Sequence, residues 1–289
     1  MQTLVVHSLV ILNKQDLGVV MASETSINFP LDELPDEVLV VVLSFCPDNF
    51  LIHKASLVCK KWRDISRGQT LWRLRCDWKG VTIPDALPPE YRDYRKLCLK
   101  NVFGRNLLKN WDATEGMNHW KHDTKYSYHR SCGIVVEDST PEESHGSDPL
   151  SELNVGTSKC WAFTYWLEIL VQEIDLIKEG LTPEILDDLQ PPISISVWTA
   201  ARVDCASRYT ISVNLLGEKG ETLEKENKFE DLREVPQWGD NSWVKISHTF
   251  RDYGKGVRQL TFVNTGKDKQ FWAGNYGPKF AAPCVEIDL

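Results

Sequence analysis

The sequence lacks several patterns that define whole classes of protein. It has no Asn-x-Ser/Thr glycosylation acceptor, no Cys-x-x-Cys pair among its eight cysteines and no Walker-type glycine-rich loop. The missing loop argues against a P-loop nucleotide-binding protein. Widely spaced cysteines, in a chain of 289 residues that is long enough to bury a core, are typical of reduced thiols in the cytosol or nucleus. We therefore predict a cytoplasmic protein.

Long hydrophobic runs and basic clusters are also scarce. The apolar run from Leu4 to Leu12 is too short to cross a bilayer, and no small-residue cleavage site follows it promptly. With 33 basic and 41 acidic residues, the net charge of −8 argues against a nucleic-acid surface. Met21 is the more natural start, so residues 1–27 are predicted to be a disordered or artefactual extension, and no membrane span is expected.

What the sequence does contain is an apolar stretch from Leu31 to Cys76. Two stripes recur at helical spacing: Val38, Val42 and Phe45, then Leu51, Ala55, Val58, Trp62 and Ile65. Pro35 suits a first helical turn, where its missing N–H costs nothing. About forty-five residues cannot bury a self-sufficient core. The stretch is therefore predicted to be a helical docking module whose core is completed by a partner.

The second half of the chain alternates apolar and polar residues. The pattern covers Trp161 to Val171, Ile193 to Val197, Tyr209 to Leu215, Val244 to Phe250, Leu260 to Phe262, and Val285 to Leu289. Short alternating segments separated by turn residues are typical of an antiparallel β-sandwich. The proline-rich residues 77–103 are predicted to be a linker with one short helix. The acidic segment from Glu137 to Glu152 is predicted to be a mobile loop.

The helical stretch resembles an F-box, the motif that docks a protein onto the Skp adaptor of cullin-based ubiquitin ligases. The resemblance is carried by Leu34-Pro35, Val38-Leu39, Val58-Cys59 and Trp62. It implies that these residues contact the adaptor or support the contact. Through the adaptor, the cullin and RING subunits are expected as partners.

The second half resembles the F-box-associated domain of the sugar-chain-recognising F-box proteins. Its landmarks are Arg105 to Leu108, Val244 to Phe250, Asp252 to Arg258, and Phe271 to Pro278. The resemblance implies an α+β chain with segregated domains: an F-box at residues 28–76, a linker at 77–103, and a galactose-binding or jelly-roll-like sandwich at 104–289. It also implies binding of the chitobiose core of N-linked high-mannose glycans on misfolded glycoproteins returned from the endoplasmic reticulum. The glycoprotein would then be ubiquitinated and degraded by the proteasome.

Four residues are the predicted glycan-binding set. A pyranose has an apolar C–H face and a rim of hydroxyls, so its site needs exposed aromatic rings and a carboxylate or amide. Phe271 and Trp272 match the aromatic pair of the family, Asp204 matches its hydroxyl-accepting aspartate, and Trp161 falls near its third aromatic residue. The stretch Phe280 to Cys284 departs from the family pattern.

That departure keeps an alternative open, in which the same ligase subunit recognises a protein surface and no sugar. A glycan-processing enzyme with a helical appendage is a further alternative, but no catalytic constellation is apparent, so we predict a non-catalytic receptor. His119 and His122, with His129 and Cys132, have metal-ligand spacing. Their cramped loop and aromatic neighbours favour sheet packing, and neither a metal nor another cofactor is predicted.

Overall fold

The computed structural model describes residues 34–123, 133–138 and 155–289. The predicted extension at residues 1–27 therefore lies outside the described residues, as does most of the predicted loop from Glu137 to Glu152. The chain divides into two compact units, Met1–Arg75 and Cys76–Leu289. Each unit is described by itself below.

The first unit is helical. Its elements are α1 (Asp36–Ser44), α2 (Asp48–His53), α3 (Ala55–Val58), α4 (Lys60–Arg67) and the first part of α5 (Gln69–Lys79). Pro35 immediately precedes α1, and the next turn begins after Pro47. The buried side chains of the unit come from every helix: Leu39, Leu43, Leu51, Ala55, Trp62, Leu71 and Trp72. The second predicted stripe supplies Leu51, Ala55 and Trp62 to this core, although Val58 is 39% exposed. The first predicted stripe is wrong as a core face, because Val38 and Phe45 are 44% and 49% exposed and α1 buries Leu39 and Leu43 instead.

Arg75 ties α5 to the turn between α1 and α2. Its guanidinium donates to the carbonyl oxygen of Cys46 at 2.6 Å and forms an ion pair with Asp48, and only 6% of its side chain is exposed. The terminal guanidinium nitrogens are thereby paired with carbonyl oxygens and a carboxylate, which offsets much of the cost of burying the charge. Arg75 therefore fixes the turn that separates the two apolar stripes.

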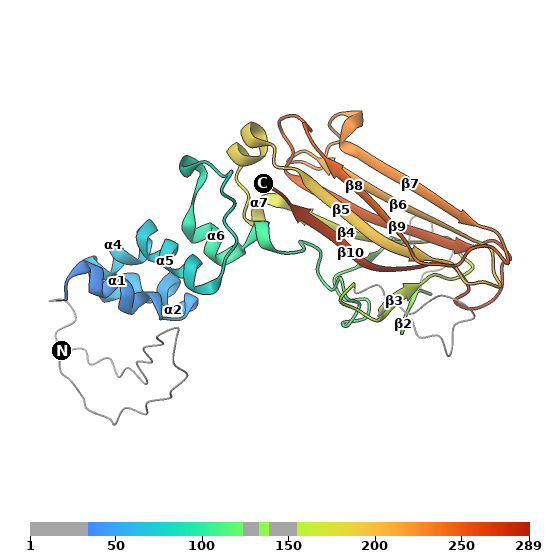
Figure 1. Ribbon diagram of the computed structural model, residues 1–289, viewed down its shortest axis with the longest axis horizontal. Helices are drawn as coiled ribbons and strands as arrows, with labels where there is room; N and C mark the ends of the chain where they lie inside the picture. Colours follow the sequence, from blue (N-terminus) through green and yellow to red (C-terminus); the bar gives the residue numbers. More distant parts are fainter. Residues whose placement is uncertain (1–33, 124–132, 139–154) are drawn as a thin grey trace, which may run out of the picture. The chain divides into compact units, whose positions relative to one another are not determined.

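The second unit begins with short helical segments and continues as two stacked sheets (Figure 1). The helical segments are η2 (Pro89–Tyr91), α6 (Tyr94–Lys100) and η3 (Val102–Gly104). Asp93 caps α6 by accepting hydrogen bonds from the N–H groups of Arg95 and Lys96 at 3.1 and 3.2 Å.

The two sheets have five strands each, and their described pairs are antiparallel. One sheet has the order β1-β4-β9-β6-β7 and the other β2-β3-β10-β5-β8. The strands are β1 (Lys121–His122), β2 (Val135–Asp138), β3 (Lys159–Ala162), β4 (Glu168–Asp175), β5 (Ile193–Ala200), β6 (Ser207–Leu216), β7 (Lys228–Val235), β8 (Val244–Phe250), β9 (Gln259–Asp268) and β10 (Lys279–Ile287). Three short helical elements lie between strands: α7 (Leu176–Glu179), η5 (Ile185–Leu189) and η6 (Lys225–Asn227). The predicted fold class, a helical F-box region followed by an antiparallel β-sandwich, is confirmed.

Aromatic rings fill the core between the sheets. Phe280 of β10 stacks on Trp161 of β3 with centroids 4.7 Å apart, and Trp120 and Phe163 pack against the same ring at 5.9 and 5.6 Å. Phe262 of β9 reaches Trp120 from the other sheet at 6.4 Å. This cluster joins the two sheets by apolar burial and edge-to-face ring contacts.

The structure differs from the sequence-based expectations in three places. The long run from Trp161 to Val171, in which a bulge or bend is expected, is divided by a turn at residues 163–167, because β3 belongs to one sheet and β4 to the other. Its alternation gives the wrong inward face in β4, where Leu170 and Ile174 are buried and Ile169 and Val171 are only half-buried. Strand β7 was not predicted, because its outward residues are charged and it lies at a sheet edge. Glu137 does not begin the predicted loop; it lies in β2.

The departure from the family pattern at Phe280 to Cys284 lies in β10. The register against β5 shifts between Ala281 and Cys284, and Ala282 has a φ of +45°. The Asn106 side chain closes this β-bulge by donating to the carbonyl oxygen of Pro283 at 2.8 Å and accepting from the N–H of Val285 at 3.0 Å. Phe280 and Ala281 are fully buried, so this part of the departure concerns core packing.

Candidate functional site

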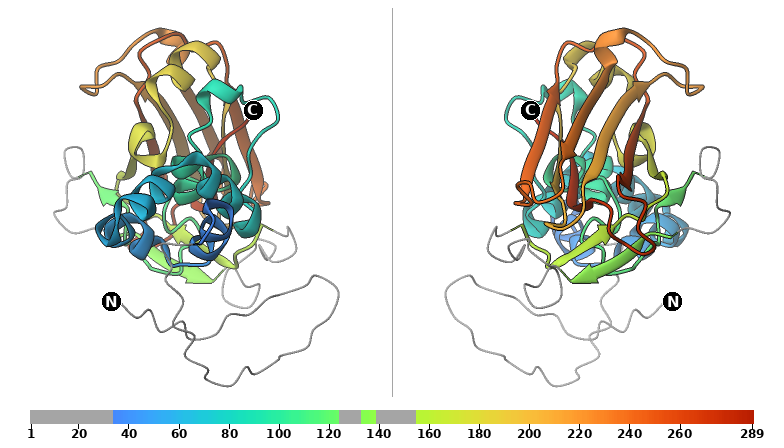
Figure 2. Two further views of the ribbon diagram at one scale, coloured as in Figure 1. Left: turned by 90° about the vertical axis from the view of Figure 1, so that its left-hand side faces the viewer. Right: turned by 90° about the vertical axis from the view of Figure 1, so that its right-hand side faces the viewer.

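Four loops gather at one end of the sandwich: residues 163–167, 201–206, 236–243 and 269–278. Figure 2 (right) looks onto this end, and hydrogen bonds join the loops to one another. Lys269 N–H donates to the carbonyl of Ala206 at 2.8 Å, and Gln270 Oε1 accepts from the N–H of Ala206 at 2.7 Å. Trp238 N–H donates to Val203 at 2.8 Å. We call these four loops the aromatic end.

Phe271 and Trp272 are held outward by a buried carboxylate. Asp268 is 2% exposed, and its two oxygens accept the N–H groups of Phe271 and Trp272 at 2.7 and 3.0 Å. Phe271 adopts a φ of +60°, a conformation that is rare for a residue with a bulky side chain. The two rings are 60% and 38% exposed. The turn therefore displays two apolar faces to solvent.

Further aromatic rings surround this pair. Tyr165 and Trp166, from the turn between β3 and β4, lie edge-on to Phe271 with centroids 5.0 and 4.7 Å away. Tyr276 lies edge-on to Trp272 at 5.7 Å. Sequence reasoning missed all three residues. Successive side chains of a strand point to opposite faces of its sheet, so the adjacent residues Tyr165 and Trp166 cannot both face the core. This adjacency is the sequence feature that could have indicated an aromatic residue outside the core.

Asp204 lies in the loop beside this cluster. Strands β6 and β9 are neighbours, and Ser207 is paired with Asp268. Asp204 precedes Ser207 by three residues and Phe271 follows Asp268 by three residues, so both leave the sheet at the same end, next to this pair. The Asp204 carbonyl accepts from the side-chain amide of Gln237 at 2.9 Å, whereas its Oδ1 is buried with no hydrogen-bond partner among the described residues.

Trp161 is placed apart from the other predicted glycan-binding residues. It is 0% exposed, its ring is stacked on Phe280, and its indole N–H donates to the carbonyl of Gly116 at 3.2 Å. The ring thus packs in the core and is not brought to the surface of the aromatic end. Tyr165 and Trp166, which are half-buried, are instead the aromatic residues that the β3–β4 turn brings against Phe271.

A polar network supports the loop of residues 269–278 from below. Arg202 donates to the carbonyl of Asn275 at 2.8 Å, lies over the ring of Tyr276, and pairs with Glu137 at 2.9 Å. Lys279, which is fully buried, pairs with the other oxygen of Glu137 at 2.7 Å. The loop of residues 269–278 is thus held in place by the ion pairs of Glu137 and by the hydrogen bond from Arg202 to Asn275.

Cys205, in the neighbouring loop of residues 201–206, adds no charge to this end of the sandwich. Burial raises the pKa of its thiol to about 11, so the thiol is neutral near pH 7.

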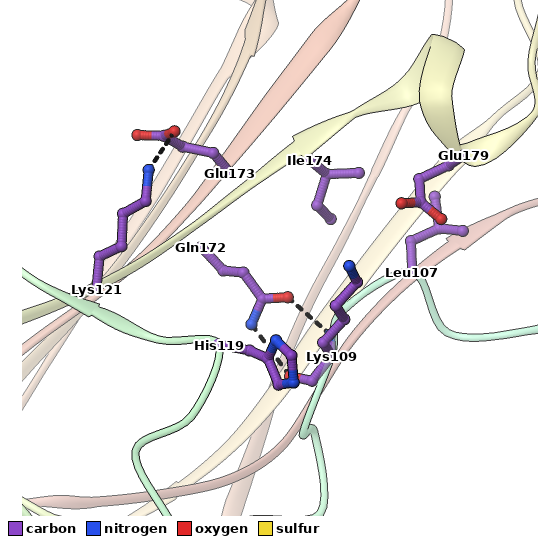
Figure 3. A pocket seen from close by; sticks show the side chains of 8 residues that line it. All are labelled: Leu107, Lys109, His119, Lys121, Gln172, Glu173, Ile174 and Glu179. Atoms are coloured by element: carbon purple, nitrogen blue, oxygen red, sulfur yellow. Dashed lines mark hydrogen bonds and ion pairs between the residues drawn. The ribbon is translucent and has the colours of Figure 1, made fainter.

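A cavity of about 160 Å³ lies elsewhere on the sandwich, beside β4 (Figure 3). It is lined by Leu107, Lys109, His119, Lys121, Gln172, Glu173, Ile174 and Glu179. Lys121 pairs with Glu173 at 2.7 Å, and the Gln172 amide exchanges hydrogen bonds with the backbone of Lys109. Its polar groups therefore serve largely to hold the chain before β1 onto β4.

The two described histidines with metal-ligand spacing, His119 and His122, each lie beside a glutamate. His122 pairs with Glu168, and His119 lies 3.4 Å from Glu115. His129 and Cys132 lie outside the described residues. In the ranges that the structure describes, no group of three or more His, Cys, Asp and Glu side chains is arranged to hold a metal ion.

In the helical unit, the predicted adaptor-binding residues fall into two groups. Leu39 and Trp62 are buried, and Cys59 caps α4 by accepting the N–H of Trp62 at 3.5 Å. Leu34 is half-buried, whereas Pro35, Val38 and Val58 are exposed, with Val38 and Val58 at 44% and 39%. Three other exposed apolar residues were not predicted to make contacts: Val41, Phe45 and Leu57. They widen the exposed apolar surface of the helices.

Among the described residues, no helix is both long and apolar enough to span a membrane. The seven described cysteines carry thiols and form no disulfide.

Comparison with known proteins connects both units to described families. Residues 31–77 match the F-box-like family, and residues 98–287 match the F-box associated region. F-box only protein 6 of Homo sapiens is 33% identical over 259 residues, which cover 89% of this chain and 84% of that protein. F-box only protein 44 of Homo sapiens is 31% identical over 259 residues, covering 89% and 96%. F-box only protein 2 of Bos taurus is 30% identical over 271 residues, covering 89% and 84%.

Among solved structures, a carbohydrate-binding module in complex with β-1,4-galactotriose is similar to the chain with a TM-score of 0.40 and 12% identity. The match covers 64% of this chain and all of the module. An F-box and an F-box associated region in one chain support the role of a substrate receptor in a Skp–cullin–F-box ubiquitin ligase. The chain belongs to the F-box proteins that carry an F-box associated region, the family of F-box only proteins 6, 44 and 2.

Proposed function

We propose that this substrate receptor binds the chitobiose core of N-linked high-mannose glycans through the aromatic end of its sandwich. The helical unit docks on the Skp adaptor, and the adaptor joins it to the cullin and RING subunits. Misfolded glycoproteins in the cytoplasm are the clients, and a separate conjugating enzyme transfers ubiquitin to them. The contribution of this chain to catalysis is proximity.

The observation that carries the proposal is the outward display of Phe271 and Trp272 by Asp268. A large exposed apolar ring costs free energy unless a ligand covers it, and here two rings are held in place beside hydrogen-bonding groups. A pyranose offers a matching apolar face and hydroxyl rim. In this proposal Trp272 and Phe271 contact the sugar face, and Asp204 accepts hydroxyl hydrogen bonds.

The test is retention of the protein on chitobiose-bearing beads. Stacking that buries about 80 Å² of apolar surface, at roughly 25 cal/mol/Å², contributes about 2 kcal/mol, or nearly thirtyfold in affinity. Trp272→Ala is expected to abolish retention because it removes this contact. Val244→Ala is the matched control, since Val244 on β8 is 39% exposed and Trp272 is 38% exposed.

Undiminished retention of Trp272→Ala would place the sugar site elsewhere. If the unsubstituted protein gives no signal on a glycan array but co-purifies with a protein client, the alternative holds: the same ligase subunit recognises a protein surface. The exposed rings of the aromatic end are then the first surface to test for that contact.

A further inference from the structure

Trp238 is the most exposed large aromatic residue among the described parts of the sandwich unit. Its side chain is 70% exposed, and its indole makes no ring contact or hydrogen bond with another described residue. It lies in the loop between β7 and β8, and the predicted glycan-binding set did not include it. Tryptophan is enriched among the residues that contribute most of the binding energy at interfaces, because burial of its large ring by a ligand is strongly favourable.

The backbone holds Trp238 in a strained and pinned conformation. Its φ is +64°; among the described phenylalanine, tyrosine and tryptophan residues, only Trp238 and Phe271 have a positive φ. The N–H of Trp238 donates to Val203 at 2.8 Å, and Gly239 N–H closes the turn onto Pro236 at 2.9 Å. Conformations of this kind persist where surrounding contacts impose them, and they cluster at binding sites.

The sheet register aligns Trp238 with the proposed sugar site. Ser207 of β6 pairs with Val235 of β7 on one side and with Asp268 of β9 on the other. These three residues are the last paired positions at the aromatic end. Three residues further into the adjoining loops lie Trp238 after Val235, Asp204 before Ser207, and Phe271 after Asp268. Neighbouring strands are about 4.8 Å apart, so the β7 and β9 positions are separated by roughly 10 Å, which is more than the width of one pyranose ring.

The surroundings of Trp238 favour a sugar over an apolar peptide. Gln237 and Asp240 flank it in the loop, and the Gln237 amide is bonded to Asp204. One flat apolar ring among hydrogen-bonding groups fits the C–H face and hydroxyl rim of a pyranose. An apolar peptide side chain would instead need a groove with apolar walls.

We propose that Trp238 forms a second sugar subsite, which stacks on a mannose residue beyond the chitobiose core. The inference rests on the proposed glycan-binding function. Asp204 then lies between Trp238 and the pair Phe271 and Trp272, and the aromatic end binds a glycan longer than a disaccharide. Trp238 increases affinity for the extended glycan and leaves affinity for chitobiose alone unchanged.

The experiment compares two probes by calorimetry: chitobiose, and the same disaccharide extended by the core mannose residues. Trp238→Ala is expected to weaken binding of the extended glycan by roughly thirtyfold, the loss for removing one stacking face, and to change chitobiose binding by less than about twofold. Trp238→Phe keeps a ring and is expected to retain most of the affinity. Leu232→Ala, at a 46% exposed residue of β7, is the control.

A second measurement needs no substitution. Oxidation of exposed tryptophans with N-bromosuccinimide, followed by mass spectrometry, is expected to modify Trp238 unless the extended glycan is present. Chitobiose is expected to protect Trp272 and not Trp238. Three results would overturn the subsite. Trp238→Ala could lose affinity for both probes equally, it could bind the extended glycan as tightly as the unsubstituted protein, or the extended glycan could fail to protect Trp238 from oxidation. If the unsubstituted protein binds neither probe, the proposed function fails first, and the subsite fails with it.

Discussion

Asp268 determines at the residue scale how the aromatic end is presented. Its buried carboxylate accepts two successive N–H groups and thereby turns the chain so that Phe271 and Trp272 face solvent. Neither ring needs to be held by its own side-chain contacts in the core. The charge of the carboxylate strengthens both hydrogen bonds. A buried side chain thus decides whether the two rings face solvent.

Asp268→Asn tests this role. The amide can accept through one oxygen only, and its NH₂ group would face a backbone N–H, so the turn loses at least one hydrogen bond. We expect a loss of about 1–2 kcal/mol in the free energy of unfolding and several-fold weaker chitobiose binding. Asp231→Asn, at an exposed aspartate of β7, is the control for a changed charge. Full binding with only reduced thermal stability would show that Asp268 is structural and does not position the rings.

At the scale of the element, one ion pair anchors η5, the inserted helical turn, to the segment before β9. Asp187 accepts from both terminal nitrogens of the Arg258 guanidinium, at 2.8 and 2.7 Å, and from the N–H of Gly256 at 2.8 Å. These contacts, the Arg258 hydrogen bonds foremost, hold the pKa of the Asp187 carboxyl below its usual range. Both side chains are about four-fifths covered, at 22% and 18% exposure, so solvent screens the pair only in part.

Because the folded-state pKa of Asp187 is depressed, its contribution to stability is present above the unfolded pKa of about 3.9 and is lost as the pH falls below that value. Asp187→Asn is therefore expected to cost about 1–2 kcal/mol near pH 7, and the difference from the unsubstituted protein should shrink below about pH 4. Denaturant unfolding at several pH values measures this. A difference that stays constant down to pH 3 would contradict the ionic origin. Asp252→Asn, at an exposed aspartate of the nearby loop, is the control.

Most elements were predictable because their side chains follow one period. The helical stripes of the first unit and the alternation of β5, β6, β8 and β9 are local patterns, and each element formed where its pattern stands. Strand β7 escaped prediction because an edge strand needs few buried residues, so its sequence carries no alternation. The inward face of β4 was mispredicted because the apolar alternation from Trp161 continues through Ile169 and Val171, whereas β4 buries Leu170 and Ile174 together with the polar residues Glu168 and Gln172. The change of sheet at the turn of residues 163–167 is a non-local property that the alternation does not show.

The candidate site was predictable where the signal was local. Phe271 and Trp272 stand in a loop rich in glycine and aromatic residues, which is visible in the sequence. Trp161 could not be placed without the fold, because an aromatic residue at the end of a strand faces either the core or solvent depending on the sheet it joins. Trp238 lies at the same end of the sheet as Asp204 and Phe271 because β7, β6 and β9 are paired in this register. Pairing between strands that are far apart in the sequence cannot be seen from local patterns.

At the scale of the whole molecule, the two units carry separate tasks. The first has an exposed apolar surface that includes Val38 and Val58, over a small buried core. A lasting complex buries more than about 1,000 Å², which exceeds what a few scattered apolar side chains supply, so the surface of several helices must contribute. The second unit carries the aromatic end. The two activities should therefore be lost independently on substitution.

Retention of purified Skp adaptor on chitobiose beads tests the whole proposal most directly, because the adaptor is retained only when one chain binds both. The unsubstituted protein is expected to retain the adaptor. Trp272→Ala should lose it while still binding the adaptor in solution, and the double substitution Leu34→Ala and Pro35→Ala should stay on the beads and lose the adaptor. Val244→Ala should behave like the unsubstituted protein. Adaptor retained on the beads by Trp272→Ala, or no adaptor retained by the unsubstituted protein, would contradict the assignment of this chain as a bridge between glycan and ligase.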